Sequence, residues 1–552
     1  MKQFKNRAAF IPAAIAAFLI YGFVVIESDI YFRITKSIDI YGRIFKEVSS
    51  NYVDRLNPEE FMLAGIKGML SSLDPYTVFI DEELQKDVDI ITKGKYNGIG
   101  ASVGIQNDKV TIIDLIEGYS AQRQGMRIGD VIFEIDGVPM SRDNYSELSK
   151  YLKRDAGTEI SVTVEREGVE EKILFNLVCE EVEIKNITYY GFVPESSNNV
   201  YIKLSGFSRS AGEEIKKALI ELSAQKEVQS IILDLRGNPG GLLDAAIDVS
   251  EKFLKTGQLI VSVIGRDTTD ISRYFSTEEP ITGKNKLAVL VDHGSASASE
   301  IVAGAIQDHD RGILLGTNSF GKGLVQTVIP LSYNTSLKIT TSRYYTPSGR
   351  CIQRINYGDE NKVFEDTTIF VGSEYFTDNN RIVYSAGGIL PDSVVDNDSE
   401  SRQVKQLLAK GMFFKFASFY FNTHENFNWK NVTEQDLFNS FLKYLSDNKF
   451  QYTSRSEKLL NDLKEEAEKE NYNLGIKENL THLLTVFQDE KDKELLKYKN
   501  DIIREIRKEI AAHTEGRGGR IIESLKYDKQ FETALSILKN DSMYKKLLNI
   551  SE

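Results

Sequence analysis

The sequence predicts an α/β fold that is interrupted by a β-rich module and flanked by helical regions. Three observations lead to this prediction. Across residues 182–400, apolar strands alternate with helical patterns, which is typical of βαβ units around a largely parallel sheet. Residues 96–181 contain short strands separated by turns instead. Residues 28–95 and 401–552 place apolar side chains at helical spacing.

Length and charge limit the protein's organisation and partners. At 552 residues the chain is several times a usual domain of roughly 100 to 200 residues, so we expect three or four folded units. Its formal net charge of −13 argues against a nucleic-acid partner, because such proteins concentrate Lys and Arg into a basic face. The five histidines form no H-E-x-x-H metal pair, and we expect no metal or organic cofactor.

The N-terminus has the pattern of an export signal. Three basic residues, Lys2, Lys5 and Arg7, precede an uncharged apolar run at Ala8–Ile26. A helix of this length, rising about 1.5 Å per residue, covers most of a hydrocarbon core about 30 Å thick. We therefore favour a membrane anchor in residues 1–27 that sends the rest of the chain outward, with a cleavable signal peptide as the alternative.

Only two cysteines occur, Cys179 and Cys351. Two thiols could pair in an oxidising compartment, but nothing in the sequence brings these two together. We expect two free thiols.

Elements can be assigned in order along the flanking and inserted regions. The N-terminal region predicts helices at 34–52 and 58–73, with Asn57 as a cap before Pro58. The β-rich module predicts four strands and one helix. The strands are 110–115, 131–135, 159–166 and 172–178, the last two forming a hairpin, and the helix is 145–152.

The alternating region predicts strands at 200–204, 230–235 and 286–291, with helices at 211–222 and 242–254. Beyond Ser401 the chain is helical and rich in Lys and Glu, which indicates solvated helix faces. We assign no chemistry to this last region, and it could pack against the core or a second subunit.

A serine lies where a strand passes into a helix. Residues 294–300 read G-S-A-S-A-S-E and follow the apolar strand 287–291. The hydroxyl of Ser297 can lie beside first-turn amides, which together with the helix dipole can stabilise an oxyanion. As an alternative, Ser297 and Glu300 fit the S-x-x-E capping box, so Ser297 could be only a helix cap.

A lysine lies between two glycines, immediately before an apolar stretch. Desolvation there would lower the pKa of Lys322 and give a neutral amine that can take a serine proton. Because strand side chains alternate, Lys322 and Gln326 are expected on one face, where Gln326 can hold the amine. The alternative is a surface lysine in a glycine turn.

A glycine-rich loop, Gly237–Gly241, follows the apolar strand 231–235. Open α/β sheets place ligands at such strand ends, and glycine permits the close approach that an amide donor to an oxyanion needs. An ordinary turn is the alternative. No G-x-S-x-G elbow occurs, and His293, four residues before Ser297, is a rival candidate for the base.

Together these segments resemble the C-terminal processing peptidase family, the tail-specific proteases, over residues 28–396. The resemblance implies a crotonase-like ββα core, Ser297 as nucleophile, Lys322 as general base and Gln326 as its orienting partner. It further implies an oxyanion hole made by backbone amides of Ala298 and Gly240. Other stretches that agree are 73–77, 343–350 and 387–392.

Residues 96–181 similarly resemble a PDZ domain. The resemblance implies that a loop holds the C-terminal carboxylate of a peptide while the adjoining strand edge pairs with it. Ser120 replaces a common proline and Gln124 a small apolar residue, which puts the peptide affinity in doubt. The implied loop residues are Gly98, Ile99, Gly100 and Ala101.

The sequence therefore predicts an exported serine endopeptidase that recognises protein C-terminal tails and cleaves with a Gln-assisted Ser/Lys mechanism. We expect it in the cell envelope, anchored in the inner membrane with its catalytic part in the periplasm or otherwise outside the cytoplasm. Its expected substrates are unfolded or tail-bearing proteins, while an adaptor protein and a homo-oligomer are left open. The alternative is a non-catalytic scaffold, since the same folds also serve binding proteins.

Overall fold

The computed structural model forms two compact units. The first contains residues up to 81 with 326–340 and 357–367, and the second contains 82–325, 341–356 and 368–552. The structure describes residues 30–550 apart from 83, 86–89, 91, 93, 107, 284, 356, 358–371, 386, 398–400, 425–427, 451–453 and 471–473.

The first described element of the first unit is a helix over residues 30–51, and α2 (Pro58–Leu70) follows it. Asn57 caps α2 as expected, since its side chain accepts the N–H of Glu59. Strand β1 (Val78–Ile80) pairs antiparallel with residues 336–338 of β18 (Ser336–Tyr345). The turn before β1 is held by Asp74, whose carboxylate accepts the backbone N–H and the hydroxyl of Thr77.

The second unit is built on a six-stranded sheet in the order β10-β11-β12-β15-β16-β21. Every neighbouring pair is parallel except β10 with β11, so the predicted largely parallel sheet is confirmed. The strands are β10 (Ile187–Phe192), β11 (Asn199–Leu204), β12 (Ser230–Asp234), β15 (Lys286–Val291), β16 (Ile313–Gly316) and β21 (Ser393–Val394).

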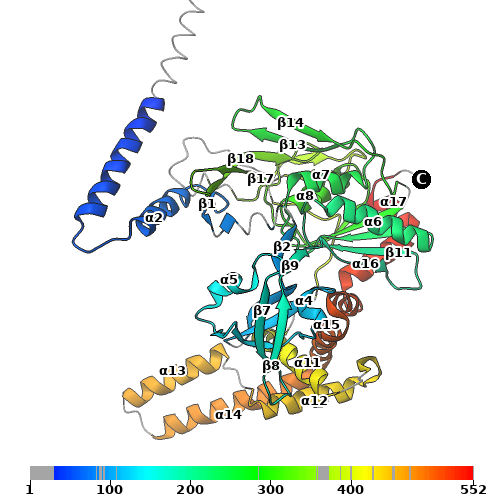
Figure 1. Ribbon diagram of the computed structural model, residues 1–552. Coiled ribbons are helices and arrows are strands. Elements are labelled where there is room, and N and C mark those ends of the chain that lie inside the picture. The colour runs from blue at the N-terminus through cyan, green and yellow to red at the C-terminus, as the bar shows by residue number, and fades with distance from the viewer. Residues whose placement is uncertain are drawn as a thin grey trace, which may run out of the picture. The chain divides into compact units, whose positions relative to one another are not determined.

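Helices cover both faces of this sheet because successive strand side chains point to opposite sides. Alternate residues such as Leu233 and Val289 pack on one face against α6 (Ala211–Gln225), α7 (Leu243–Glu251) and α8 (Ala298–Asp308). Ile232 and Leu290 face the other side and pack against α16 (Lys529–Lys539) and α17 (Asp541–Leu547). Figure 1 shows α6, α7 and α8 grouped together, with α16 and α17 in red.

A second, antiparallel layer joins β13 (Leu259–Gly265) to β14 (Ile271–Phe275) and to residues 342–345 of β18. Strand β17 (Leu324–Pro330) also pairs with β18. Of this layer the sequence predicted only the apolar stretch of β17; β13 was missed although its sequence is apolar over Leu259–Gly265, and β14 is mostly exposed.

The inserted module has its own apolar core and an antiparallel sheet in the order β3-β4-β5-β7-β8. The predicted hairpin of β7 and β8 is confirmed. Its elements are β2 (Lys95–Gly98), β3 (Ala101–Gln106), β4 (Lys109–Leu115), α4 (Ser120–Arg123), β5 (Val131–Ile135), β6 (Val138–Pro139), η1 (Tyr145–Glu147), α5 (Leu148–Leu152), β7 (Glu159–Glu165), β8 (Ile173–Val178) and β9 (Glu180–Glu183).

The C-terminal region is helical, as predicted. A separate apolar core unites α10, α11, α12 and the first half of α15, and α15 is interrupted at Gly516, whose φ of 65° and ψ of −159° are not helical. The remaining elements are α10 (Arg402–Ala409), α11 (Met412–Thr423), η2 (Trp429–Asn431), α12 (Glu434–Asp447), α13 (Arg455–Lys469), α14 (Leu474–Lys497) and α15 (Lys499–Leu525).

Cys179 and Cys351 are both buried and free, as expected. The predicted anchor in residues 1–27 lies outside the described residues, and none of the described helices is long and apolar enough to cross a membrane.

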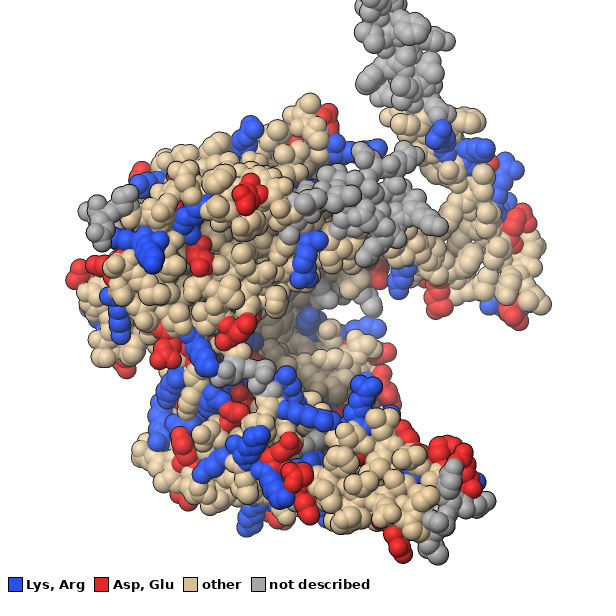
Figure 2. Space-filling model, turned by 180° about the vertical axis from the view of Figure 1, so that it is seen from behind, with Lys and Arg blue, Asp and Glu red and all other residues tan. Residues whose placement is uncertain are grey.

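On the face shown in Figure 2, Lys and Arg are interspersed with Asp and Glu over the described surface.

Candidate active site

Ser297 is the N-cap residue of α8 and has a strained backbone. Its φ of 55° and ψ of −112° lie in a region that residues other than glycine rarely occupy. Such strain persists only where surrounding contacts impose it, and it is commonly found at functional sites. The following residue, Ala298, is the first of the helix, so its N–H has no intrahelical carbonyl to bond.

The glycine-rich loop packs directly against the Ser297 turn. The N–H of Ala296 and the hydroxyl of Ser299 both donate to the backbone carbonyl of Asn238, at 3.0 and 2.9 Å. A Cβ added at Gly240 would lie 2.9 Å from the backbone N of Ala298 and 3.0 Å from the Cβ of Ser297. The structure therefore brings both predicted oxyanion donors, Gly240 and Ala298, beside the predicted nucleophile.

The amide of Gly240 already has a partner in this structure. It donates to the side-chain Oδ1 of Asn238 at 2.9 Å, while the Nδ2 of Asn238 donates to the carbonyl of Leu204. Asn238 is fully buried, so its side chain fixes the middle of the loop. As an oxyanion donor, the Gly240 N–H would have to share or leave this bond.

A single buried carboxylate joins the serine to the lysine loop. Oε2 of Glu300 accepts the backbone N–H of Ser297 at 2.8 Å and that of Lys322 at 3.0 Å. Oε1 accepts the hydroxyl of Ser319 at 2.6 Å and the N–H of Gly321 at 2.7 Å. Burial raises the pKa of Glu300 to about 7, although these four hydrogen bonds oppose the rise.

This role of Glu300 was missed at the level of sequence. The S-x-x-E pattern correctly placed Ser297 at the helix start, and Glu300 accepts its N–H as in a capping box. The pattern gives no information on Ser319, Gly321 or Lys322, which reach the same carboxylate from 19 to 22 residues further along the chain.

Lys322 lies immediately before the strand, as the sequence placed it, and is not itself part of that strand. Strand β17 begins at Leu324, and the amides of Gly321 and Lys322 bond to Glu300 rather than to a neighbouring strand. Strand alternation therefore does not fix the side of the chain on which the partly buried Lys322 side chain lies. Gln326 belongs to the first unit, where its amide donates to Thr340, and its pairing with Lys322 stays a prediction.

Other predicted motifs support this site by packing. Gly321 and Gly388 have φ values of +84° and +85°, and a Cβ on either would lie 3.1 Å from the backbone N of the other. Buried Tyr344 donates its hydroxyl to the carbonyl of Ser297 at 3.3 Å. The rival base His293 is exposed, and no hydrogen bond described in the structure joins it to Ser297.

A buried charged cluster underlies the start of the glycine-rich loop. Asp234, at the end of β12, accepts hydrogen bonds from Arg236, Lys203 and Tyr201, and the Nζ of Lys203 also donates to the carbonyl of Arg236. Burial alone would raise the pKa of Asp234, but Arg236 and Lys203 outweigh it and hold this pKa well below its usual range.

The inserted module contains a groove beside the predicted carboxylate loop. A cavity of about 450 Å³ lies between β3 and the helical segment η1–α5. Ile99 and Ala101 line it, whereas Gly98, the last residue of β2, and Gly100 flank Ile99. On the opposite side, apolar Leu148 and Leu152 line the groove. Tyr145 closes part of it by donating its hydroxyl to the carbonyl of Val103 at 2.9 Å.

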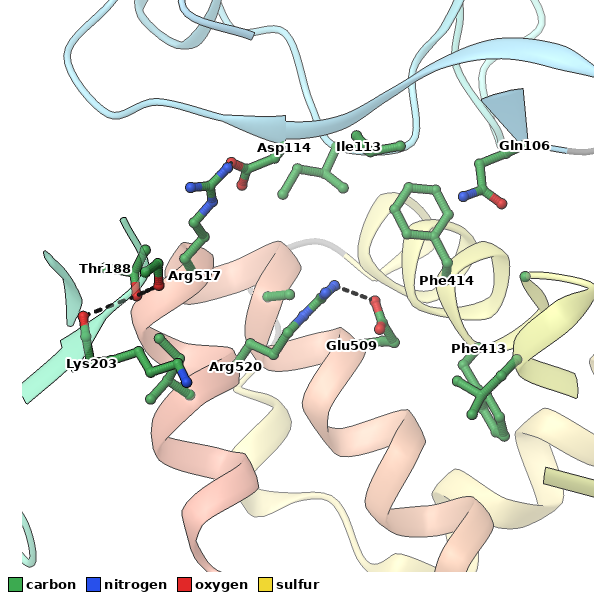
Figure 3. Close-up of a pocket in the computed structure, with 16 residues that line it drawn as sticks. Gln106, Ile113, Asp114, Thr188, Lys203, Phe413, Phe414, Glu509, Arg517 and Arg520 are labelled. Carbon is green, nitrogen blue, oxygen red and sulfur yellow. Dashed lines mark hydrogen bonds and ion pairs between the residues drawn. The ribbon is translucent and has the colours of Figure 1, made fainter. Parts of the chain in front are cut away.

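A second cavity, of about 620 Å³, lies among the inserted module, β11 and the C-terminal helices (Figure 3). Arg517 pairs with Asp114, and Arg520 pairs with Glu509. Both arginines that line the cavity are thus paired with carboxylates. No three His, Cys, Asp or Glu side chains gather as a metal site in the part of the chain that the structure describes.

Comparisons with known proteins identify the family. The model of peptidase family S41 matches residues 198–360, a PDZ domain model matches 111–166, and the model "Probable PDZ-protease, C-terminal helical domain" matches 403–538. The structure of a photosystem II D1 C-terminal processing protease aligns with a TM-score of 0.33 at 27% identity, covering 57% of this chain and 89% of that one.

Two relatives are similar over most of their length. A carboxy-terminal-processing protease of Bartonella bacilliformis is 38% identical over 323 residues, covering 58% of this chain and 73% of the relative. The carboxy-terminal processing protease CtpB of Bacillus subtilis is 30% identical over 384 residues, covering 69% and 76%. The chain therefore belongs to peptidase family S41, the carboxy-terminal-processing serine proteases, and carries a PDZ domain.

Proposed function

We propose that the chain is an exported endopeptidase in which Ser297 is the nucleophile, Lys322 the general base and Gln326 its orienting partner. The observation that carries this proposal is the strained N-cap position of Ser297, tied through Glu300 to the loop of Lys322. Glu300 fixes both backbones, so each side chain starts from a defined position, as a nucleophile and its base require.

The chemistry follows from these roles. Neutral Lys322 takes the proton of the Ser297 hydroxyl while the oxygen attacks a peptide carbonyl. The amides of Ala298 and Gly240 hold the resulting oxyanion. Lys322 then returns the proton to the leaving amine as the peptide C–N bond breaks. Water, deprotonated by Lys322, attacks the acyl-enzyme, the ester bond to the Ser297 oxygen breaks, and Lys322 returns the proton to that oxygen as the new carboxyl group leaves.

Substrate selection is assigned to the PDZ domain. Its groove offers an apolar cavity of about 450 Å³ beside a loop whose turn is formed by Ile99 and Gly100. An extended chain that added to the edge of β3 would place its terminal carboxylate at this loop and an apolar side chain in the cavity. We infer that proteins with unfolded, apolar C-terminal tails are the substrates.

The cellular setting is part of the proposal and rests on the N-terminal sequence. The basic residues and the apolar run at Ala8–Ile26 support export and retention by an inner-membrane anchor, with the peptidase on the periplasmic side. Fractionation of cells into soluble and membrane pools, combined with protease accessibility in spheroplasts, tests this assignment. Recovery of the full chain in the cytosol would contradict it.

Activity is tested with the purified full chain and an unstructured protein that ends in apolar residues. Ser297→Ala and Lys322→Ala are each expected to abolish cleavage, whereas the exposed controls Ser223→Ala and Lys255→Ala keep it. Cleavage that survived either active-site change would overturn the assignment of that residue. A wild-type chain that binds the tail but never cuts it would favour the non-catalytic scaffold.

A further inference from the structure

The glycine-rich loop begins at Arg236, which is held on its inner side by Asp234. The backbone N–H and the Nε of Arg236 both donate to this carboxylate, at 2.9 and 3.0 Å, and its Nη2 donates at 2.6 Å. The guanidinium is almost buried, with 12% of the side chain exposed. Arg236 is therefore the fixed point from which the loop leaves the sheet.

The outer side of the same guanidinium is held by the C-terminal region. Its Nη1 lies 2.7 Å from Oδ2 of Asp528 and donates to Oε1 of Gln530 at 2.8 Å. These residues are almost 300 positions away in the sequence, beyond the part of the chain that matches the S41 peptidase model. Two polar contacts thus connect the C-terminal helices to the base of the loop.

The segment that carries Asp528 and Gln530 is itself rigidly attached to the sheet. Phe531 and Ile537 of α16 are buried against the sheet's second face. The Nε2 of Gln530 donates to the carbonyl of Val395, next to β21. Oδ1 of Asp528 caps α16 by accepting the N–H groups of Gln530 and Phe531. The contacts to Arg236 therefore start from a fixed platform.

The loop needs such support because three of the residues at 237–241 are glycines. Gly237 and Gly240 have positive φ values of 66° and 97°, and glycine gives the chain wide conformational freedom. The position of Gly240 beside Ser297 depends on Asn238 in the middle of the loop and also on what holds the start of the loop at Arg236. A catalytic group displaced by about 1 Å can lose about 10²-fold in rate, so small movements of this loop matter.

We propose that Asp528 and Gln530 are positioning residues for peptide hydrolysis. By clamping Arg236 from outside the peptidase domain, they fix the loop that presents the Gly240 amide to the oxyanion. This inference rests on the proposed function of Ser297 and Gly240. It assigns the C-terminal helical domain a part in the chemistry, in addition to its packing on the sheet.

Two substitutions separate positioning from helix capping. Asp528→Asn keeps a good N-cap residue but removes the charge and turns an NH₂ group or a weaker acceptor toward Arg236. Asp528→Glu keeps the charge but is a poorer cap. If Asp528 positions Arg236, the Asn variant loses rate and the Glu variant mainly loses thermal stability. If Asp528 only caps α16, the Asn variant keeps the wild-type rate, and the Glu variant again loses only thermal stability.

The measurement compares kcat, KM and inhibition by a peptide aldehyde in the full chain. The aldehyde adds to Ser297 as a hemiacetal whose oxygen occupies the oxyanion site, so its Ki reports the position of the loop. We expect Asp528→Asn and Gln530→Ala to lower kcat about tenfold and to raise the Ki by a similar factor, with KM changed less than about twofold. Titration with a fluorophosphonate corrects each rate for the fraction of active enzyme.

Asp541→Asn is the matched control. Asp541 also joins the C-terminal helices to the sheet, through an ion pair with Lys286, but does not contact the loop. It should retain the wild-type kcat and Ki. Asp528→Asn and Gln530→Ala enzymes with unchanged kcat and Ki would refute the inference while leaving the peptidase intact. An inert wild-type chain would refute the proposed function instead.

Discussion

Ser297 and Lys322 donate their backbone N–H groups to the same oxygen atom, Oε2 of Glu300, at 2.8 and 3.0 Å. The two predicted catalytic residues lie in different loops, one opening α8 and the other preceding β17. Their common acceptor is fully buried, so the carboxylate cannot exchange these partners for water. The relative position of nucleophile and base thus depends on one side chain that takes no part in the proposed proton transfer.

Replacement of this carboxylate should therefore disable the enzyme. Glu300→Gln puts an NH₂ group opposite backbone donors, and each buried donor left unpaired costs about 1–3 kcal/mol. We expect kcat to fall by at least about 10²-fold through displaced loops. The measurement is kcat per fluorophosphonate-reactive site, with folding checked by circular dichroism. Glu251→Gln is the control, because Glu251 is also buried but uses only one oxygen for Thr277. Normal turnover in Glu300→Gln would show that the shared contact is dispensable.

Activity should decline in mild acid as Glu300 becomes protonated. Its pKa is raised by burial to about 7, so near this pH one oxygen changes from an acceptor to a hydroxyl that faces other donors. Protonation of Glu300 lowers activity but has the opposite effect on folding stability. A folded pKa above the unfolded value means that the contribution of Glu300 to folding stability is present below the unfolded pKa and is lost as the pH rises through about 7.

Infrared difference spectroscopy can assign this titration to Glu300. The C=O stretch of a protonated carboxyl should disappear near pH 7 in the wild-type chain and be absent from Glu300→Gln. A profile of kcat/KM recorded in parallel should fall over the same pH range as the pH is lowered. If the band titrates near the ordinary pKa of a glutamate, the acid sensitivity has another origin.

Gly240→Ala should abolish cleavage through steric exclusion. The added Cβ would lie 2.6 Å from the carbonyl oxygen of Ala296 and 2.9 Å from the N of Ala298, so the loop must move away from Ser297. Gly257→Ala is the matched control, since Gly257 also has a positive φ, of 85°, but no atom lies within 4 Å of its added Cβ. Both variants carry backbone strain, and only the first should lose kcat and fluorophosphonate reactivity. Equal activity in the two variants would argue against a tight loop.

Tyr145→Phe should strengthen tail binding. The Tyr145 hydroxyl donates to the carbonyl of Val103 on the groove side of β3, an acceptor that an added peptide strand would use. In the wild-type chain, a peptide that pairs with this carbonyl must displace the Tyr145 hydroxyl and lose a hydrogen bond worth about 0.5–1.5 kcal/mol net. The Phe variant avoids this cost, which corresponds to an affinity gain of about 2- to 10-fold. Fluorescence anisotropy with a labelled peptide ending in a free carboxylate measures the change. Tyr151→Phe and an amidated peptide are the controls. Unchanged or weaker binding would mean that the peptide does not pair with this edge.

The local framework of this protein could be predicted from short patterns in its sequence. The apolar strand Lys286–Val291 followed by S-x-x-E places Ser297 at a helix N-terminus, because strand periodicity and capping act within a few residues. The same locality gave the parallel sheet and the β7–β8 hairpin. The motifs around Ser297, Lys322 and Gly240 also pointed to the peptidase family, since the required residue types are written directly in the chain.

How these pieces meet depends on contacts between residues that are distant in the chain. Glu300 joins Ser297 to Lys322, and Lys322 lies outside β17, because a buried carboxylate takes amides that would otherwise seek a neighbouring strand. Asp528 reaches Arg236 because α16 packs its apolar face on the sheet and thereby brings its N-terminal cap beside the glycine-rich loop. Contacts between such distant residues depend on the packing of whole elements, and no local pattern in the sequence encodes them.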